Sequence, residues 1–268
     1  SQGLQMWLTE FPQPRPPREL WDANPVYRQI DEGLSQHHVE NPEFMGLHYM
    51  SAGEVEECWQ LLRQSLMSIS YESLAHIPSY SAWLAEQDWT PAYARHRRNL
   101  QLIGANDPDK RWVLKNPSHL FALDALMEVY PDAIVVQTHR APETIIASMC
   151  SLAEHATQDY STVFTRERIG ATQLDLWSRG LREFSAARAK YDPAQFVDID
   201  FAELRSDPFG AVQQVYDAIG ADFTHDARAA MVALDEDSKS GDRRPQHKYS
   251  LADYGLTAEQ VAEAFAQR

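Results

Sequence analysis

The stretch from residue 112 to residue 152 constrains the fold most, because it alternates apolar runs with helical patterns. Residues 112–115 (WVLK) and 133–138 (AIVVQT) are short apolar runs with β-branched centres, which are typical of buried strands. Each run is followed by a proline-marked helix start, at Pro117 and at Pro142. Two parallel strands joined by a helix form a right-handed βαβ unit. The sequence therefore predicts an α/β fold with a parallel sheet flanked by helices.

Basic and imidazole side chains stand where each predicted strand passes into its helix. Lys115 and His119 follow the first strand, and His139 and Arg140 follow the second. Ligands of open α/β sheets bind at the carboxyl ends of the strands, and helix N-termini there attract anions. These residues therefore predict a site for an anionic ligand.

The net charge of the chain limits its partners. A formal charge of -15 over 268 residues argues against non-specific binding to nucleic acid or to an anionic membrane surface. An acidic protein must bind an anionic ligand through a local cationic cluster, and one more such cluster lies near the C-terminus. We expect a basic loop over residues 239–256 to fold over the sheet edge; its basic residues are Lys239, Arg243, Arg244, His247 and Lys248.

The two cysteines and the hydropathy pattern favour one cellular compartment. Cys58 and Cys150 lie far apart in helical patterns, which favours buried thiols in a reducing environment over a disulfide. No apolar run approaches the roughly 20 residues of a membrane span, and no signal peptide opens the chain. We therefore expect a cytoplasmic protein without a transmembrane segment.

Helical periodicity organises the rest of the chain. Its length suits one α/β domain over residues 1–268, with the helix-rich residues 51–105 as an insertion that shapes an acceptor pocket. Within this block we expect one amphipathic helix over residues 52–75. The basic run at residues 95–98 (RHRR) is either a solvated helix face or a contact for an anionic ligand. A third strand is predicted at residues 195–200.

Four pieces of the sequence, taken in order, resemble the sulfotransferase family. The central piece is the strand VVQT with His139, Arg140 and Pro142, followed by five further residues and Ser148; it resembles the family's Arg-x-Pro-x5-Ser pattern. The stretch from Lys115 to His119 (KNPSH) resembles a Lys-Ser/Thr-Pro-x-His stretch of bacterial members. Two later pieces resemble the family's next strand and helix and its C-terminal basic loop; they span residues 195–220 and 241–256.

The resemblance implies a P-loop NTPase-like fold and transfer of a sulfuryl group from 3′-phosphoadenosine 5′-phosphosulfate to a hydroxyl of a small-molecule, lipid or glycan acceptor. Lys115 would stabilise charge near the transferred group, and His119 would take the acceptor's proton. Phe201 stands where the family often has an aromatic residue that contacts adenine. The 3′-phosphate would be held by Arg140 and Ser148, with His139 and the loop residues Arg243, Arg244, His247 and Lys248.

The sequence departs from the family pattern in two places. No stretch matches the Gly-rich loop that binds the 5′-phosphosulfate, and the family places this loop, with the first strand, upstream of residue 1. We therefore expect weak donor binding by residues 1–268 alone. Lys115 and His119 are four residues apart, whereas the branch that sulfates phenols and steroids has them two apart. This spacing leaves His119 open as either a base or a structural histidine.

Two other classes of function remain open from the sequence. A small-molecule kinase on a P-loop fold would need a carboxylate for Mg²⁺ at a strand end, for which Asp198 and Asp200 are available. A non-catalytic interaction protein that retains the fold is the second class. No Asp, Glu or His spacing suits a catalytic metal, and a homodimer is one of the oligomeric states left open.

Overall fold

The computed structural model describes residues 1–41, 49–157, 160–239 and 249–266. The chain divides into two compact units, an N-terminal unit from Ser1 to Val129 and a C-terminal unit from Tyr130 to Arg268. In the described ranges, no helix has the length and hydropathy needed to cross a membrane. The single domain predicted over residues 1–268 stays a prediction.

The N-terminal unit is built of helices around an aromatic core. Trp7, which has no exposed surface, lies with its ring centroid 5.8 Å from that of Trp21 and 5.7 Å from that of Tyr27. Its helices are α1 (Met6–Glu10), η1 (Arg18–Ala23), α2 (Pro25–Glu40), α4 (Trp59–Arg63), α5 (Ser70–Ser73), α6 (Pro78–Ala85), α7 (Thr90–Ile103), η2 (Pro117–Phe121) and α8 (Leu123–Val129).

The single helix predicted over residues 52–75 is wrong. The backbone N–H of Glu56 donates to Leu4 O at 2.7 Å and Glu54 O accepts from Met6, so this part pairs with the N-terminal segment instead of forming a helix. Farther on, Leu66 has a φ of 55°. This left-handed backbone conformation is incompatible with a helix that continues from α4 to α5. The later helices of the predicted insertion, α6 and α7, are confirmed.

The strand predicted at residues 112–115 is also wrong. Trp112 forms only an isolated parallel bridge to Gln2, and Val113 N donates to Gln2 O at 2.9 Å. At its other end Lys115 O accepts from Cys58 N at 3.0 Å. Both ends of the segment thus bond to parts of the chain that come earlier in the sequence, and not to a strand of the sheet. The predicted helix start after it is confirmed, since Asn116 Oδ1 accepts from Ser118 N at 2.7 Å.

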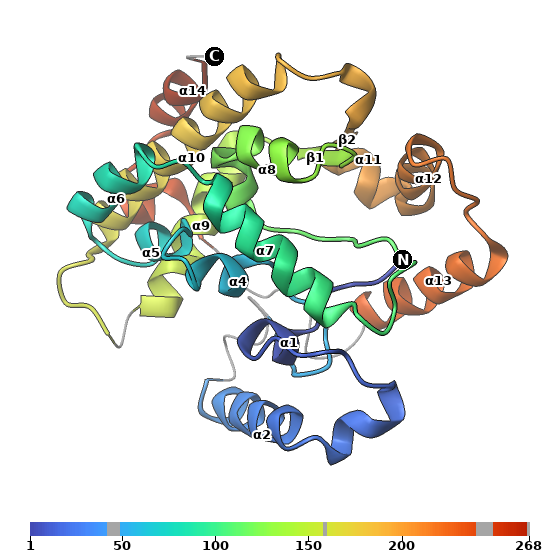
Figure 1. Ribbon diagram of the computed structural model, residues 1–268. Helices are drawn as coiled ribbons and strands as arrows, with labels where there is room; N and C mark the ends of the chain where they lie inside the picture. The colour runs from blue at the N-terminus through green and yellow to red at the C-terminus, as the bar shows by residue number, and fades with distance from the viewer. Residues whose placement is uncertain (42–48, 158–159, 240–248, 267–268) are drawn as a thin grey trace. The chain divides into compact units, whose positions relative to one another are not determined.

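The C-terminal unit contains the parallel strands β1 (Val135–His139) and β2 (Phe196–Asp200), as predicted for both runs. Their register pairs Val135 with Phe196 and His139 with Asp200, so their carboxyl ends are adjacent. The crossover contains α9 (Pro142–Thr157), α10 (Arg166–Arg188) and η3 (Pro193–Gln195) (Figure 1). After β2 come α11 (Phe201–Ser206), α12 (Pro208–Ala218), α13 (His225–Lys239), η4 (Leu251–Tyr254) and α14 (Ala258–Ala266).

Helix α10 is the centre of packing in the C-terminal unit. It contacts α9, η4 and α14, and its residues Ile169, Leu176 and Phe184 are buried. Cys150 on α9 is a buried free thiol, as predicted, and burial raises its pKa to about 12. Cys58 in the N-terminal unit is likewise buried and free.

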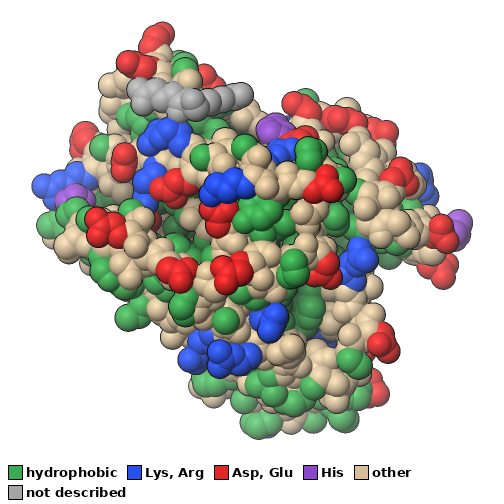
Figure 2. Space-filling model, turned by 45° about the horizontal axis from the view of Figure 1, so that its top comes forward, with side chains coloured by type: hydrophobic (Ala, Val, Ile, Leu, Met, Phe, Trp, Pro, Cys, Tyr) green, Lys and Arg blue, Asp and Glu red, His purple; other side chains and the backbone are tan. Residues whose placement is uncertain are grey.

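One face of the molecule is mixed in charge although the chain is acidic overall. On the face drawn in Figure 2, acidic and basic side chains are interspersed among apolar ones. Such a surface keeps like charges apart and does not form a broad field of one sign on that face.

The close contact of α10 with η4 predicts a severe effect of one added methyl group. A Cβ on Gly170 would lie 2.1 Å from the carbonyl oxygen of Tyr254, so Gly170→Ala is expected to lower the free energy of unfolding by about 1–3 kcal/mol. Gly33→Ala is the matched control: a Cβ meets nothing within 4 Å in the middle of α2, and alanine should stabilise by about 0.5–1 kcal/mol. Urea unfolding of both variants measures the difference, and an unchanged midpoint for Gly170→Ala would contradict this packing.

Candidate functional site

The exposed guanidinium of Arg140 follows β1 in the C-terminal unit. Its Cζ lies 4.6 Å from the ring centroid of Phe201, the first residue after β2. Among the described residues Arg140 has no carboxylate partner, so its charge is not neutralised there. A guanidinium stacked on a ring keeps its N–H groups in the guanidinium plane, where they can donate to the two oxygens of a phosphate.

His139, the last residue of β1, is held by a chain of polar contacts. Its Nε2 lies 2.6 Å from Asp198 Oδ1 on β2. Arg188 donates to both carboxylate oxygens of Asp198 at 2.7 and 2.5 Å and to Gln137 Oε1 at 2.8 Å. The pKa of Asp198 lies well below its usual range, chiefly because Arg188 donates hydrogen bonds to it and also because of its hydrogen bond with His139. The imidazole of His139 is therefore oriented by a permanently charged carboxylate.

Ser148 lies on α9, the helix that begins two residues after Arg140. It is half-buried and six residues from Pro142, which is about 9 Å along the helix axis. Arg140 and Ser148 thus follow the same strand, one before α9 and one within it, and their shared part at the 3′-phosphate stays a prediction.

Lys115 in the N-terminal unit forms an ion pair that the sequence did not indicate. Its Nζ contacts Glu57 Oε1, and 72% of the Lys115 side chain is exposed. Because the ammonium group itself is open to solvent, it can turn from Glu57 toward another anion.

His119 is bound to a tyrosine from α7. Its Nδ1 lies 2.6 Å from the hydroxyl oxygen of Tyr93, which is fully buried. Burial, and then the positive charge of Lys115, lowers the pKa of His119 to about 4. Burial, and then His119, lowers the pKa of His96 to about 3. Both imidazoles are therefore neutral at pH 7, the state in which a histidine can accept a proton.

Sequence reasoning missed the roles of Tyr93 and His96. The aromatic residues of this block, Tyr93 among them, were expected to lie mostly in the core, with some lining the acceptor pocket. His96 stood inside the run of residues 95–98, which was expected to be either a solvated helix face or a contact for an anionic ligand. The structure corrects this expectation, because His96 is 1% exposed while the arginines beside it are exposed. The only available signal was the helical spacing of three residues between Tyr93 and His96, which places them on one face of α7.

A hollow of about 410 Å³ lies within the helical block predicted to shape an acceptor pocket. Met67, Trp83 and Pro91 give it apolar walls, and Arg95 and Arg98 contribute two cations. Trp83 is 43% exposed. Two of the four residues in the basic run, Arg95 and Arg98, thus line a hollow that also has apolar walls.

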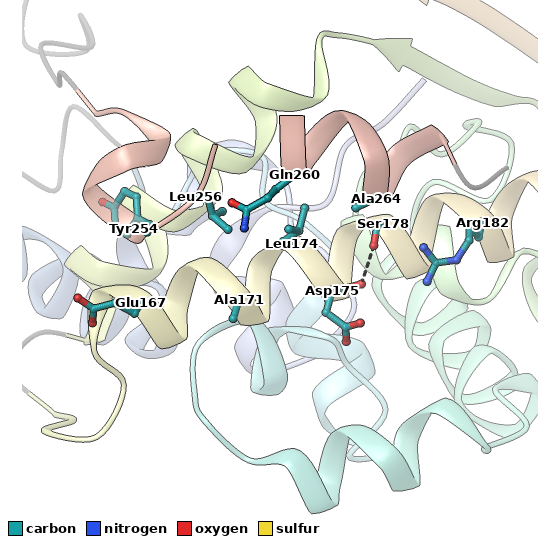
Figure 3. Close-up of a pocket in the computed structure, with 11 residues that line it drawn as sticks. Glu167, Ala171, Leu174, Asp175, Ser178, Arg182, Tyr254, Leu256, Gln260 and Ala264 are labelled. Atoms are coloured by element: carbon teal, nitrogen blue, oxygen red, sulfur yellow. Dashed lines mark hydrogen bonds between the residues drawn. The ribbon is translucent and has the colours of Figure 1, made fainter. Parts of the chain in front are cut away.

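A second hollow, of about 500 Å³, lies in the C-terminal unit between α10, η4 and α14 (Figure 3). Glu167 and Asp175 give it an acidic side along α10, opposite Leu256 and Gln260. Of the described residues predicted to bind the donor, which are His139, Arg140 and Ser148, none lines it. Its position gives it no part in the candidate site.

The basic loop of the prediction lies largely outside the described residues, which exclude Arg243, Arg244, His247 and Lys248. Its described end forms η4, whose Ser250 and Asp253 make a capping box. The folding of this loop over the sheet edge stays a prediction.

The two carboxylates available to a kinase-type Mg²⁺ site already have protein partners. Asp198 is bound by Arg188 and His139, and Asp200 Oδ1 accepts from Ala202 N at 2.7 Å at the start of α11. In the part of the chain that the structure describes, no group of three or more His, Cys, Asp or Glu could hold a metal ion. These contacts favour the sulfotransferase interpretation over the kinase.

Comparison with known proteins agrees with this interpretation. Residues 2–225 match the Sulfotransferase family. The chain belongs to the sulfotransferase family. Over 208 residues it is 23% identical to the omega-hydroxy-beta-dihydromenaquinone-9 sulfotransferase Stf3 of Mycobacterium bovis and, equally, of Mycobacterium tuberculosis. That match covers 70% of this chain and 49% of each Stf3, so the chain spans about half the length of these relatives.

Solved sulfotransferase structures share the fold. The crystal structure of STF1 from Mycobacterium tuberculosis H37Rv is 62% identical, with a TM-score of 0.89 over all of this chain and 70% of that one. STF9 from Mycobacterium avium, at 23% identity, has a TM-score of 0.85 over 99% of this chain and 69% of that one. The α/β, P-loop-like fold predicted from the sequence is confirmed.

The two neutral histidines predict a pH-dependent stability. Unfolding raises their pKa values from about 3 and 4 toward 6.5, so the unfolded chain binds more protons below pH 6.5. The free energy of unfolding should therefore fall as the pH decreases from 6.5 to 4, by about 1.4 kcal/mol per pH unit for each histidine.

His96→Gln should remove its share of this slope, whereas His225→Gln, at a side chain that is 94% exposed, should leave the slope unchanged. Denaturant titrations between pH 4 and 7 measure the three slopes. Equal slopes for the wild type and His96→Gln would show that the buried histidine is already charged in the folded protein.

Proposed function

We propose that the protein transfers a sulfuryl group from 3′-phosphoadenosine 5′-phosphosulfate to a hydroxyl group of its acceptor. The observation that carries the proposal is Arg140, a guanidinium without a carboxylate partner among the described residues, stacked on Phe201 at the carboxyl ends of β1 and β2. A cation beside an aromatic ring suits a ligand that carries a phosphate near an adenine. Family membership supports the same reading.

In this proposal the 3′-phosphate receives hydrogen bonds from Arg140 and Ser148. His139 lies next to Arg140 in the chain, and its Nε2–H is taken by Asp198, so only in its imidazolium form would its Nδ1–H donate to the same phosphate. The loop residues keep their predicted part at the same phosphate; they are Arg243, Arg244, His247 and Lys248. The 5′-phosphosulfate requires backbone donors that residues 1–268 do not offer as a recognisable Gly-rich loop.

The transfer itself depends on positioning and on charge. The acceptor oxygen attacks sulfur, the bond from sulfur to the 5′-phosphate oxygen breaks, and adenosine 3′,5′-bisphosphate leaves. His119, neutral at pH 7, takes the hydroxyl proton. Lys115 releases Glu57 and stabilises the negative charge that develops on the leaving oxygen.

For the acceptor we propose an alcohol with a large apolar body. The hollow beside Trp83 has apolar walls and a cationic edge at Arg95 and Arg98, which suits a lipid-like molecule with a polar group. The name of Stf3 gives omega-hydroxy-beta-dihydromenaquinone-9 as the molecule that this relative sulfates. We place the reaction in the cytoplasm, where the buried thiols of Cys58 and Cys150 would remain reduced.

Donor binding tests the function directly. Adenosine 3′,5′-bisphosphate without Mg²⁺ should raise the melting temperature, and Arg140→Ala should weaken its affinity by about 10–100-fold, since charge-assisted hydrogen bonds contribute about 1.5–3 kcal/mol. Arg228→Ala is the matched control, because Arg228 also stacks on aromatic rings, those of Phe209 and Phe223, away from the strand ends.

If only ATP with Mg²⁺ stabilises the wild type, the sulfotransferase proposal is wrong and the protein is a candidate kinase. No response to either nucleotide in a protein that also carries the Gly-rich 5′-phosphosulfate loop would favour a non-catalytic role.

Acceptor recognition is tested by transfer of radiolabelled sulfate from the donor to a bacterial lipid extract. Trp83→Ala should raise the KM for the labelled lipid about tenfold, because it removes one apolar wall of the hollow, and should leave donor affinity unchanged. Leu102→Ala removes a similarly exposed apolar side chain from α7 outside the hollow and serves as the control. Label found only on water-soluble glycans would overturn the lipid assignment.

A further inference from the structure

The contact between Tyr93 and His119 is set by two well-anchored elements. Tyr93 has no exposed surface and belongs to α7, a helix of 14 residues. His119 lies in η2, whose first turn is capped by the buried side chain of Asn116. The 2.6 Å between Tyr93 Oη and His119 Nδ1 therefore joins two side chains with little freedom to move apart.

A neutral imidazole can make this contact in two ways. If the tyrosine hydroxyl donates to Nδ1, the ring proton of His119 is on Nε2, and Nε2 cannot accept another. If Nδ1–H donates to the tyrosine oxygen, Nε2 has a free electron pair and can act as a base. Among the described residues no hydrogen bond to His119 Nε2 is present, so this nitrogen is available to a substrate.

The charged form of the ring separates these two arrangements. An imidazolium carries a proton on both nitrogens, so Tyr93 Oη must be the acceptor once His119 has taken a proton. An oxygen that already accepts from Nδ1–H needs no rotation of the hydroxyl group during the reaction. Preorganised hydrogen bonds of this kind stabilise charge as it develops in a transition state.

We propose that Tyr93 is a positioning residue that accepts the Nδ1 proton of His119 and so holds the imidazole in the tautomer whose Nε2 takes the acceptor's proton. The part of this inference that concerns proton transfer, its catalytic half, rests on the proposed sulfuryl transfer. The part that concerns the tautomer of His119 does not. In the reaction the hydroxyl proton of the acceptor passes to Nε2, Nδ1–H stays bound to Tyr93, and the ring later releases the added proton to water.

A tyrosine in this place differs from a carboxylate in its charge. A carboxylate would raise the pKa of the histidine and favour the imidazolium form. The neutral hydroxyl of Tyr93 orients the ring without doing so, in agreement with the lowered pKa of His119, about 4. Tyr93 thus orients the ring, while burial, and then the charge of Lys115, lowers its pKa and keeps it uncharged at pH 7.

Nuclear magnetic resonance of protein labelled with nitrogen-15 histidine tests the tautomer without any enzyme assay. At pH 7 the wild type should show His119 as the Nδ1–H form, and Tyr93→Phe, which keeps the ring and removes the hydroxyl, should lose that preference. Tyr80→Phe is the matched control, since its hydroxyl donates to Leu66 O in the same unit and not to a histidine. An Nε2–H tautomer in the wild type overturns the proposal, even if Tyr93→Phe fails to fold.

Turnover then tests the catalytic half. Tyr93→Phe should lower kcat about tenfold, the effect of one lost hydrogen bond, with KM for donor and acceptor within about twofold of the wild type. In a His119→Ala background the same change should have no further effect, because the two residues act as a unit. An equal loss in both backgrounds would assign Tyr93 a merely structural role. A wild type that binds no donor and transfers no sulfate would overturn the proposed function and leave the tautomer result standing.

Discussion

The parallel pairing of β1 with β2 is the constraint on which the proposed donor site depends. Its register sets His139 beside Asp200, so the residues that follow the two strands emerge next to each other. Arg140 and Phe201 are those residues, and their stacking at 4.6 Å is a consequence of strand register and not of sequence proximity. A slip of one residue would turn the side chains of one strand to the opposite face and separate them.

In the N-terminal unit, burial determines the protonation state of the histidines. The side chains of Tyr93, His96 and His119 lie in surroundings poor in water, where the charged form of an imidazole is unfavourable. Within a chain whose net charge is -15, these two histidines remain neutral because desolvation disfavours their charged form, and a neighbouring basic group, His119 for His96 and Lys115 for His119, lowers their pKa values further. The chemistry of His119 thus follows from its packing as much as from its sequence motif.

Most local signals were read correctly from the sequence, but the helical periodicity of residues 52–75 was misleading and the long-range partners were not predicted. The helix starts at Pro117 and Pro142 and the two paired strands depend on nearby residues, and the structure confirms them. Residues 112–115 have the composition of a strand, but their backbone pairs with Gln2 and Cys58, which no local pattern specifies. The bond from Tyr93 to His119 spans 26 residues and was missed for the same reason. The family and its fold were predicted from the order of the four motifs, which helical and strand periodicity alone could not indicate.

The contact of Arg188 with Asp198 and Gln137 ties the length of a helix to the geometry of a sheet. Arg188 is the last residue of α10, which has 23 residues, and it reaches both strands from that position. Each residue inserted into α10 would rotate its end by about 100° and shift it by about 1.5 Å, which would carry the guanidinium away from the carboxylate. Relatives that keep the contact of Arg188 with Asp198 and Gln137 should therefore preserve the number of residues within α10. Differences in length should occur instead in the connection before Arg166.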